Sequence, residues 1–211
     1  MILGFDHLSY SSTDLDRSAE KLRKLGYTEQ FSETGLENYP VKKPLLEEFQ
    51  PLHGLRYFKH SNGFALEATY YRDTPATSSG LFQIDLENPE IISLHTRRPD
   101  KEYRFWTKGF GFKEQDEGKL AFTTPVPQWN CTLQLVKDDR AGETSYLDSS
   151  GYPCMAFLCT RLEEELKNLQ EAGAHTVVDP HQIEVNSKLL TLTMFRSPSG
   201  AVCELIQIDK Q

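Results

Sequence analysis

The sequence repeats one pattern three times, and this repeat constrains the fold more than any other feature. In each copy an apolar strand-like segment leads into a short amphipathic helix, the helix ends at a glycine, and short strand-like segments follow. The three helix-ending glycines are Gly26, Gly111 and Gly173. Glycine is favoured there because it adopts the left-handed conformation that commonly closes a helix. We therefore predict three units, each built as strand, helix and three further strands.

The first copy shows the pattern most fully. Its opening strand covers residues 3–11, and Leu15, Ala19 and Leu22 then fall on one helical face. Further strands are expected near 28–31, 55–60 and 64–71, with an Asn62-Gly63 turn before the last one. The stretch 33–53 is too long for a simple hairpin loop, so we expect a lid or an ordered flap there.

The repeat also sets the domain boundaries. We place the first unit at 1–72, the second at 90–137 and the third at 153–209, with linkers at 73–89 and 138–152. In the third unit a short strand is expected at 176–178, before two longer ones. The linkers are rich in the turn-forming residues Gly, Ser, Thr, Pro and Asp, which favour irregular structure.

Composition and charge narrow the partners. The chain has 211 residues, a formal net charge of -8 and no basic run, which argues against nucleic acid and anionic membranes. Its start lacks a signal-peptide pattern, and no window approaches the roughly 18 apolar residues of a membrane span, so we expect a cytoplasmic protein. The four cysteines lack paired C-x-x-C spacing, and we interpret them as reduced core thiols.

Strand alternation predicts a polar inner face opposite an apolar, helix-packed face. On the opening strand the inward set is Phe5, His7, Ser9 and Ser11. On the closing strand of the first unit the inward set is Ala65, Glu67 and Thr69, which leaves Phe64, Leu66 and Ala68 for the helix side. An imidazole and a carboxylate on one concave face suit a divalent metal ion such as Zn²⁺, Fe²⁺, Ni²⁺ or Mn²⁺.

Three βαβββ units with a Gly-x-x-x-Glu spacing at the closing strand resemble the vicinal oxygen chelate superfamily of glyoxalases, bleomycin-resistance proteins and ring-cleaving dioxygenases. The spacing occurs from Gly63 to Glu67 and from Gly200 to Glu204. The resemblance implies an α+β fold of paired modules, with curved mixed sheets and helices on the convex side. It also implies metal ligands from a histidine on the first strand and a glutamate on the last strand of each unit.

Only the first unit matches both ligand positions, with His7 and Glu67. The second unit offers His95 or Ser93 on its first strand and Gln134 on its last. The third unit has a cysteine, Cys154, at the histidine position and Glu204 on its last strand. The candidate metal ligands are His7, Glu67, His95 and Gln134, and the candidate catalytic carboxylates are Glu67 and Glu204. We expect the histidines His53, His60, His175 and His181 to be exposed to solvent.

An odd number of units leaves the pairing open. The first unit could pair with the second, which gives the better ligand set, the second could pair with the third, or a homodimer could complete the site. The leading hypothesis is a metal-dependent lyase, isomerase or dioxygenase acting on a small oxygenated substrate. The alternative is a metal-free binding protein of the bleomycin-resistance type, which Ser93, Gln134 and Cys154 favour. A third hypothesis is an interaction module with a vestigial cavity.

Overall fold

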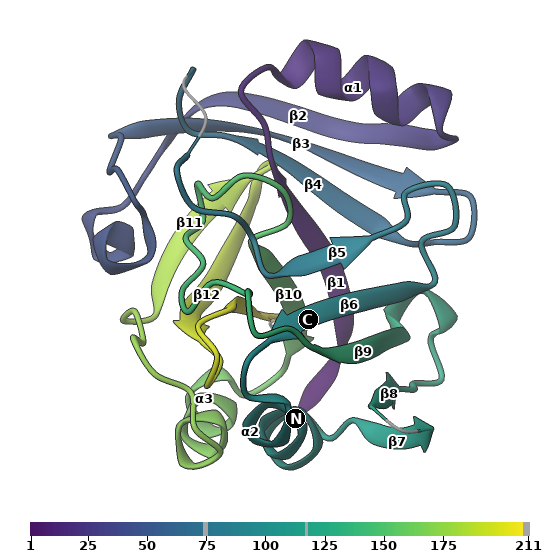
Figure 1. Cartoon of the computed structure of the whole chain (residues 1–211). Helices are drawn as coiled ribbons and strands as arrows, with labels where there is room; N and C mark the ends of the chain where they lie inside the picture. Colours follow the sequence, from purple (N-terminus) through teal and green to yellow (C-terminus); the bar gives the residue numbers. More distant parts are fainter. Residues whose placement is uncertain (74–75, 117, 209–211) are drawn as a thin grey trace.

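The computed structural model describes residues 1–73, 76–116 and 118–208. Residue 209, the predicted end of the third unit, and residues 74–75 of the first linker lie outside the described residues. Within the described part the chain is a mixed α+β protein, as predicted, with two curved sheets and helices packed on their outer faces (Figure 1).

The first unit begins with a long strand and a capped helix. Its elements are β1 (Ile2–Ser11), α1 (Leu15–Lys24), β2 (Tyr27–Glu37), η1 (Pro40–Leu45), β3 (Leu52–His60) and β4 (Ala65–Tyr70). The Asp14 side chain caps α1 by accepting a hydrogen bond from the backbone N–H of Arg17 at 2.9 Å. The predicted strand near 28–31 extends to Glu37, and the predicted flap contains the 3₁₀-helix η1.

The other two units follow the same order. The first linker and second unit contain β5 (Phe82–Ile84), β6 (Ile91–Thr96), α2 (Pro99–Arg104), the π-helical turn η2 (Phe105–Phe110), β7 (Lys113–Asp116), β8 (Lys119–Phe122), η3 (Pro127–Trp129) and β9 (Cys131–Lys137). The third unit contains β10 (Cys154–Cys159), α3 (Leu162–Glu171), β11 (His181–Val185), β12 (Lys188–Arg196) and β13 (Val202–Gln207). The strand expected at 176–178 is wrong, because Thr176 adopts a left-handed φ of 49° that interrupts an extended chain.

The three glycines predicted to end the helices have φ values of +85°, +84° and +116°, at Gly26, Gly111 and Gly173. The two closing turns also match, with φ of +93° at Gly63 and +89° at Gly200. All five positions use the left-handed region that glycine enters without steric cost.

The first and third units, rather than neighbouring units, form one sheet. Strands β1 and β10 pair antiparallel and join the units into an eight-stranded sheet of order β11-β12-β13-β10-β1-β4-β3-β2. The second unit forms a separate five-stranded sheet of order β5-β6-β9-β8-β7. Pairing between adjacent units, as considered from the sequence, is therefore wrong. Strand β5 explains this arrangement. In the first unit, one edge of β1 pairs with β10. In the second unit, β5 pairs antiparallel with the equivalent edge of β6, so that edge is not open to another unit.

An aromatic core fastens the second unit to the third. Phe110 of η2 lies 4.4 Å from Phe157 of β10 between ring centroids, and Phe105 and Trp106 are fully buried beside it. At the far end of this core the carboxylate of Glu102 accepts hydrogen bonds from Trp106 Nε1 at 2.7 Å, Ser197 Oγ at 2.8 Å and the Ser199 backbone N–H at 2.7 Å. The second unit therefore braces the convex side of the eight-stranded sheet.

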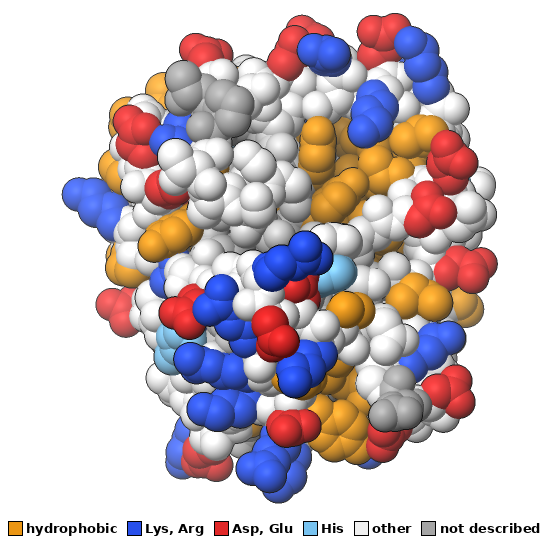
Figure 2. All heavy atoms as spheres, viewed as in Figure 1, with side chains coloured by type: hydrophobic (Ala, Val, Ile, Leu, Met, Phe, Trp, Pro, Cys, Tyr) orange, Lys and Arg blue, Asp and Glu red, His pale blue; other side chains and the backbone are white. Residues whose placement is uncertain are grey.

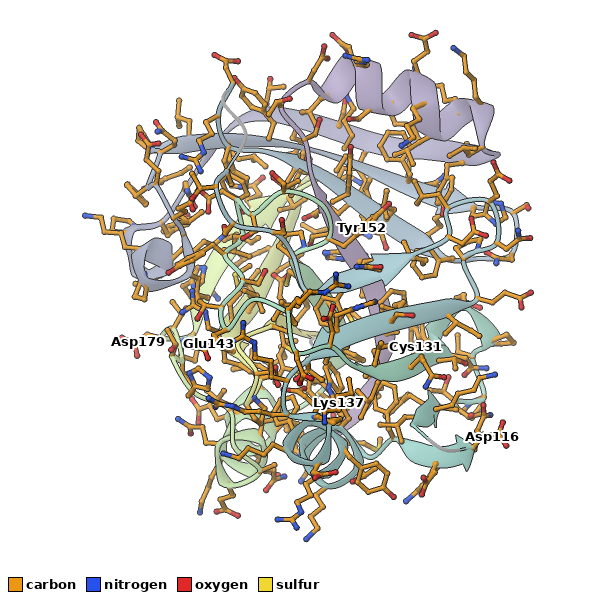
Figure 3. The ribbon with its side chains drawn as sticks, viewed as in Figure 1. Asp116, Cys131, Lys137, Glu143, Tyr152 and Asp179 are labelled. Atoms are coloured by element: carbon orange, nitrogen blue, oxygen red, sulfur yellow. The ribbon has the colours of Figure 1, made fainter. Side chains whose placement is uncertain are left out.

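The second linker packs along the first unit. Tyr152, labelled in Figure 3, lies 5.5 Å from Tyr10 of β1 between ring centroids.

Cys131, also labelled there, is buried at the start of β9. All four cysteines are buried and free, as predicted.

Both signs of charge occur on the surface. In the view of Figure 2, lysine and arginine side chains gather over the lower half, with acidic side chains among them. Within residues 1–73, 76–116 and 118–208, no helix is long and apolar enough to cross a membrane.

Candidate functional site

A β-bulge in β1 directs His7 to the concave face of the eight-stranded sheet. The register with β10 shifts between Phe5, which lies opposite Phe157, and His7, which lies opposite Ala156, so Asp6 is the extra residue. Phe5 consequently turns to the convex core and stacks on Phe64 with centroids 5.4 Å apart. The prediction that Phe5 shares a face with His7 is wrong for this reason, since simple alternation does not include a bulge.

His7 lies between two carboxylates. Its Nε2 atom is 3.7 Å from Glu67 Oε1 and 3.8 Å from Glu204 Oε2. On the other side of the ring, Nδ1 lies 2.8 Å from Asp6 Oδ2, which orients the imidazole. His7 is only 3% exposed, and Nε2 is buried without a hydrogen-bond partner among the described residues. A buried nitrogen without a partner is unusual and marks a place where a further atom would bind.

The first and third units place these residues in equivalent positions. Glu67 lies opposite Ser9 of β1, and Glu204 lies opposite Ala156 of β10. Two residues earlier on the opening strands are His7 and Cys154, so Cys154 occupies the histidine position of the third unit. Burial raises the pKa of the Cys154 thiol well above its usual value, and the charge of Glu204 adds to this effect. Cys154 is therefore a protonated thiol near neutral pH.

The pKa values of the cluster reflect opposing effects. Burial works to lower the pKa of His7, but Glu67, Asp6 and Glu204 together outweigh it and raise the pKa to about 9. Burial raises the pKa of Glu204 to about 7, while the charge of His7 opposes the rise and that of Glu67 adds to it. Without a bound cation, the cluster therefore holds protons near neutral pH.

Lys42 reaches the same cavity from η1 and was not predicted from the sequence. It is 3% exposed, and burial lowers the pKa of its ammonium group, while the charges of Glu204 and Glu67 raise it. The only sequence signal was the length of the predicted flap. Because η1 is a short 3₁₀-helix, its sequence has no clear hydrophobic periodicity from which the direction of the Lys42 side chain could be predicted.

The cavity has a polar end and an apolar wall. Its volume is about 100 Å³. The polar lining comprises Asp6, His7, Lys42, His53, Tyr57, Glu67, Thr69, Tyr71 and Glu204. The apolar lining comprises Phe31, Leu55 and the aliphatic side chains Ile183, Val185, Leu190, Leu192, Met194 and Ile206 of β11, β12 and β13. Such a combination suits a small ligand that is oxygen-rich at one end and hydrocarbon at the other.

His53 also belongs to the cavity, contrary to the expectation that it is exposed. His53 lies in β3. Its ring stacks on the ring of Tyr71, the residue that follows β4, with centroids 5.5 Å apart. Burial, together with the charge of Lys42, lowers the pKa of His53 to about 3. His53 is therefore a neutral imidazole at physiological pH.

The remaining predicted ligands, His95 and Gln134, lie in the other sheet. His95 is on β6, with Nδ1 3.4 Å from Asp138 Oδ2, and Gln134 is on β9 opposite Ser93. Because β5 covers the β6 edge, this sheet does not join the one that holds His7 and Glu67. The structure thus brings together His7, Glu67 and Glu204, and does not bring His95 or Gln134 to them.

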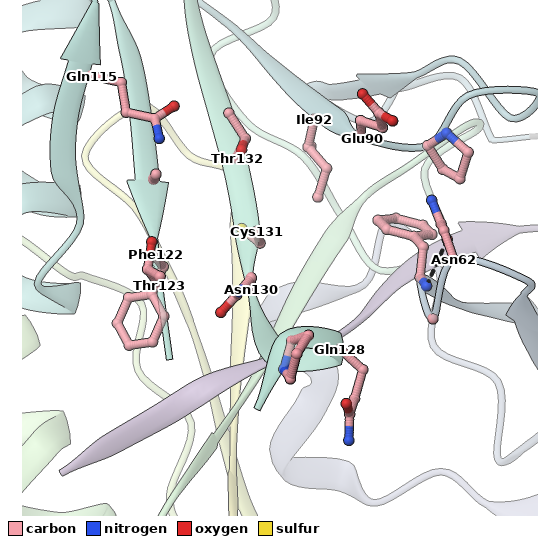
Figure 4. A pocket seen from close by; sticks show the side chains of 15 residues that line it. Asn62, Glu90, Ile92, Gln115, Phe122, Thr123, Gln128, Asn130, Cys131 and Thr132 are labelled. Carbon is pink, nitrogen blue, oxygen red and sulfur yellow. Dashed lines mark hydrogen bonds between the residues drawn. The ribbon is translucent and has the colours of Figure 1, made fainter. Parts of the chain in front are cut away.

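A larger hollow of about 350 Å³ lies between the β3–β4 turn and the five-stranded sheet (Figure 4). Its polar lining is mostly neutral amide and hydroxyl groups, including Asn62, Gln115 and Gln128, and its one acidic side chain is Glu90. A hollow of about 440 Å³ beside the start of α1 is larger still, so size alone does not select the site. We assign the candidate site to the smaller cavity because only that one combines buried titratable groups with an unpartnered imidazole nitrogen.

No protein-family model and no curated protein matches the chain. Among solved structures it is similar to glyoxalase I from Zea mays, with 17% identity over 98% of this chain and 68% of that chain and a TM-score of 0.41. It is also similar to a glyoxalase/bleomycin resistance protein/dioxygenase family enzyme from Burkholderia phytofirmans, with 12% identity over 56% and 97% of the two chains and a TM-score of 0.42. A further similar structure is the fosfomycin resistance protein FosX from Mesorhizobium loti, with 11% identity over 56% and 89% and a TM-score of 0.41.

The chain's own elements form an α+β fold of repeated βαβββ units, two of which join through β1 and β10. At these identities and TM-scores the similarity to the solved structures supports no statement about activity.

Proposed function

We propose that this chain is a divalent-metal-dependent enzyme for a small oxygenated molecule, with His7, Glu67 and Glu204 as the metal ligands. The observation that carries the proposal is the buried Nε2 of His7, which lacks a hydrogen-bond partner among the described residues and faces two carboxylate oxygens at 3.7 and 3.8 Å. One imidazole and two carboxylates form a donor set suited to Zn²⁺, Fe²⁺, Ni²⁺ or Mn²⁺.

The two distances at His7 are close to those of a metal site, although among the described residues no group of three or more His, Cys, Asp or Glu side chains is already arranged to hold a metal ion. Metal–ligand bonds of about 2.0–2.2 Å place neighbouring donor atoms roughly 3–3.5 Å apart. The separations at His7 exceed this by a few tenths of an ångström, which small side-chain adjustments would close. Asp6 on the opposite ring nitrogen is the kind of outer carboxylate that commonly orients a metal-binding histidine.

The chain's own residues would supply positioning and proton transfer. A bound divalent ion with open positions polarises a substrate oxygen. In the metal-free cavity, burial raises the pKa of the Cys154 thiol and disfavours the thiolate that would serve as a fourth ligand, which would leave a position free. In the metal-free protein, burial raises the pKa of Glu204 to about 7, so its carboxyl group would be suited to exchange a proton near neutral pH only while it is not coordinated.

A metal-free binding protein is the second candidate, and Lys42 favours it. Its buried amino group lies in the cavity that holds Asp6, Glu67 and Glu204, and the charges of Glu204 and Glu67 favour its protonated form against the effect of burial on its pKa. In that case the cavity would sequester a small molecule without transforming it.

Metal analysis tests the choice. Chelator-treated protein would be incubated separately with Zn²⁺, Mn²⁺, Ni²⁺ and Fe²⁺ under exclusion of oxygen, desalted, and analysed by mass spectrometry for metal and by thermal unfolding. We expect about one ion per chain for at least one metal, a raised unfolding temperature, and loss of both in His7→Ala. The matched control is His95→Ala, because His95 also lies beside a carboxylate but outside the cavity. Failure of the wild type to retain or respond to any of these ions would favour the binding protein.

A further inference from the structure

Lys42 places a buried amino group in the cavity, and the proposed metal ligands do not require it. Among the described residues this side chain forms neither an ion pair nor a hydrogen bond, although Lys42 is only 3% exposed to solvent. Burying an ammonium group without direct partners is unfavourable, and the more distant charges of Glu204 and Glu67 offset only part of this cost. The three N–H donors of the group are therefore left for a ligand in the cavity.

The segment that carries Lys42 is held firmly by the third unit and the second linker. Arg196 Nη1 donates to the Pro44 carbonyl at 2.9 Å, and the Leu147 backbone N–H donates to the Leu45 carbonyl at 2.8 Å. Just beyond η1, Asp148 accepts hydrogen bonds from the backbone N–H groups of Glu47 at 2.7 Å and Glu48 at 3.1 Å. The ammonium is thus positioned before any ligand arrives, which lowers the entropic cost of binding.

The rest of the cavity limits what that ligand can be. Its volume of about 100 Å³ is well below the roughly 300–1,000 Å³ of pockets for drug-sized ligands, so the ligand has few atoms. One wall consists of aliphatic side chains from β11 to β13, including Ile183, Leu192 and Met194. A ligand that fills this space has a short hydrocarbon part against the wall and its polar atoms near Lys42 and the His7 cluster.

We propose that Lys42 binds the carboxylate of a short aliphatic hydroxy or keto acid. The oxygen next to that carboxylate faces His7, Glu67 and Glu204, and the hydrocarbon part packs on the β11–β13 wall. This inference names the substrate class of the metal site and so rests on the proposed function. Lys42 is then the residue that admits an anion into a cavity already lined by three carboxylates.

Calorimetric binding of two matched probes tests this inference. The probes are 2-hydroxy-3-methylbutanoate and its neutral amide, titrated into metal-treated wild type, Lys42→Gln and Lys43→Gln, with the metal content of each protein measured. We expect the wild type to bind the acid at least about tenfold more tightly than the amide, which corresponds to about 1.4 kcal/mol. Lys42→Gln is expected to bind both probes equally and to retain its metal. Lys43→Gln should behave as wild type, because Lys43 lies outside the cavity, over the ring of Phe49.

Each outcome decides between the two proposals. The role of Lys42 is overturned if the wild type binds the acid and the amide with equal affinity, or if it binds neither at millimolar concentration. Both outcomes are measured on the wild type, so they do not depend on whether Lys42→Gln folds. A preference for the acid that persists in Lys42→Gln overturns it as well. A wild type without metal contradicts the proposed function, whereas a Lys42-dependent preference in that same protein would still support the acid-binding role.

Discussion

The Nε2 atom of His7 lies 3.8 Å from Oε2 of Glu204, although the two residues belong to the first and last units of the chain. They meet because β1 and β10 pair antiparallel and carry β4 and β13 on either side. One chain therefore supplies both halves of the cluster. A homodimer stays a prediction, but it is not required to bring His7, Glu67 and Glu204 together.

The stability that Glu204 and His7 contribute to the metal-free protein should fall as pH rises from about 4.5 to 9. The pKa of Glu204 rises from 4.5 to about 7 on folding, chiefly through burial, and that of His7 rises from 6.5 to about 9 because nearby carboxylates outweigh burial. Raised pKa values favour the protonated groups in the folded state, so each contribution is complete below the unfolded pKa and is lost through the folded pKa. The loss, on the order of a few kcal/mol, would be measured by urea unfolding across this pH range.

Two variants separate the contributions of the groups. Glu204→Gln should flatten the profile between about pH 4.5 and 7, and His7→Gln should flatten it between about 6.5 and 9. Bound metal should act in the opposite direction, because the ion competes with these protons and binds more tightly as pH rises. Profiles of Glu204→Gln and His7→Gln that run parallel to the metal-free wild type from pH 4.5 to 9 would contradict the raised pKa values.

Asp148→Asn should loosen the segment that carries Lys42. The Asp148 carboxylate accepts from the backbone N–H groups of Glu47 and Glu48 and lies 3.3 Å from Arg72. An amide has one acceptor oxygen in place of two and no charge, so at least one of these interactions is lost. We expect faster amide hydrogen exchange at residues 45–48 and about tenfold weaker acid binding, with metal content unchanged.

Asp138→Asn is the matched control for that experiment. Asp138 also accepts a backbone hydrogen bond in the second linker, from Arg140, but its recorded partners do not include the Lys42 segment. Equal exchange rates at residues 45–48 in Asp148→Asn and wild type would show that Asp148 does not hold this segment.

Glu102→Ala should destabilise the protein by about 2–4 kcal/mol in urea unfolding, because three buried donors from Trp106, Ser197 and Ser199 lose their acceptor. Metal content should not change, since Glu102 lies on the convex side of the eight-stranded sheet. Glu114→Ala serves for comparison, because Glu114 is exposed and, among the described residues, its side chain accepts a hydrogen bond from the Tyr103 hydroxyl alone. Similar stabilities of the two variants would mean that the Glu102 network does not fasten the second unit.

The three repeated units could be predicted from short-range sequence signals. Which units pair in the sheet could not be predicted from those signals. The glycines at 26, 111 and 173 and the turns at Gly63 and Gly200 are short-range signals, and each was found where the sequence placed it. The residues of β5 sit in a linker without a clear strand pattern, and their pairing with β6 decides which units join. Sequence patterns record local periodicity, and they do not record which edge of a sheet remains open.

The same distinction applies to the site. His7, Glu67 and Glu204 could be proposed because their strand positions repeat between the first and third units. Asp6 could not, because it faces the cavity through a bulge that alternation does not predict. Lys42 could not, because it comes from a 3₁₀ segment inside a long insertion.

The covering of β6 by β5 separates the middle copy from the candidate site. Among the described residues, the middle copy contributes no side chain to the wall of the cavity. Substitutions of Gln134 or His95 would therefore leave the residues of the His7 cluster in place. The middle copy is the part of the molecule in which a second site could be engineered while the first stays intact.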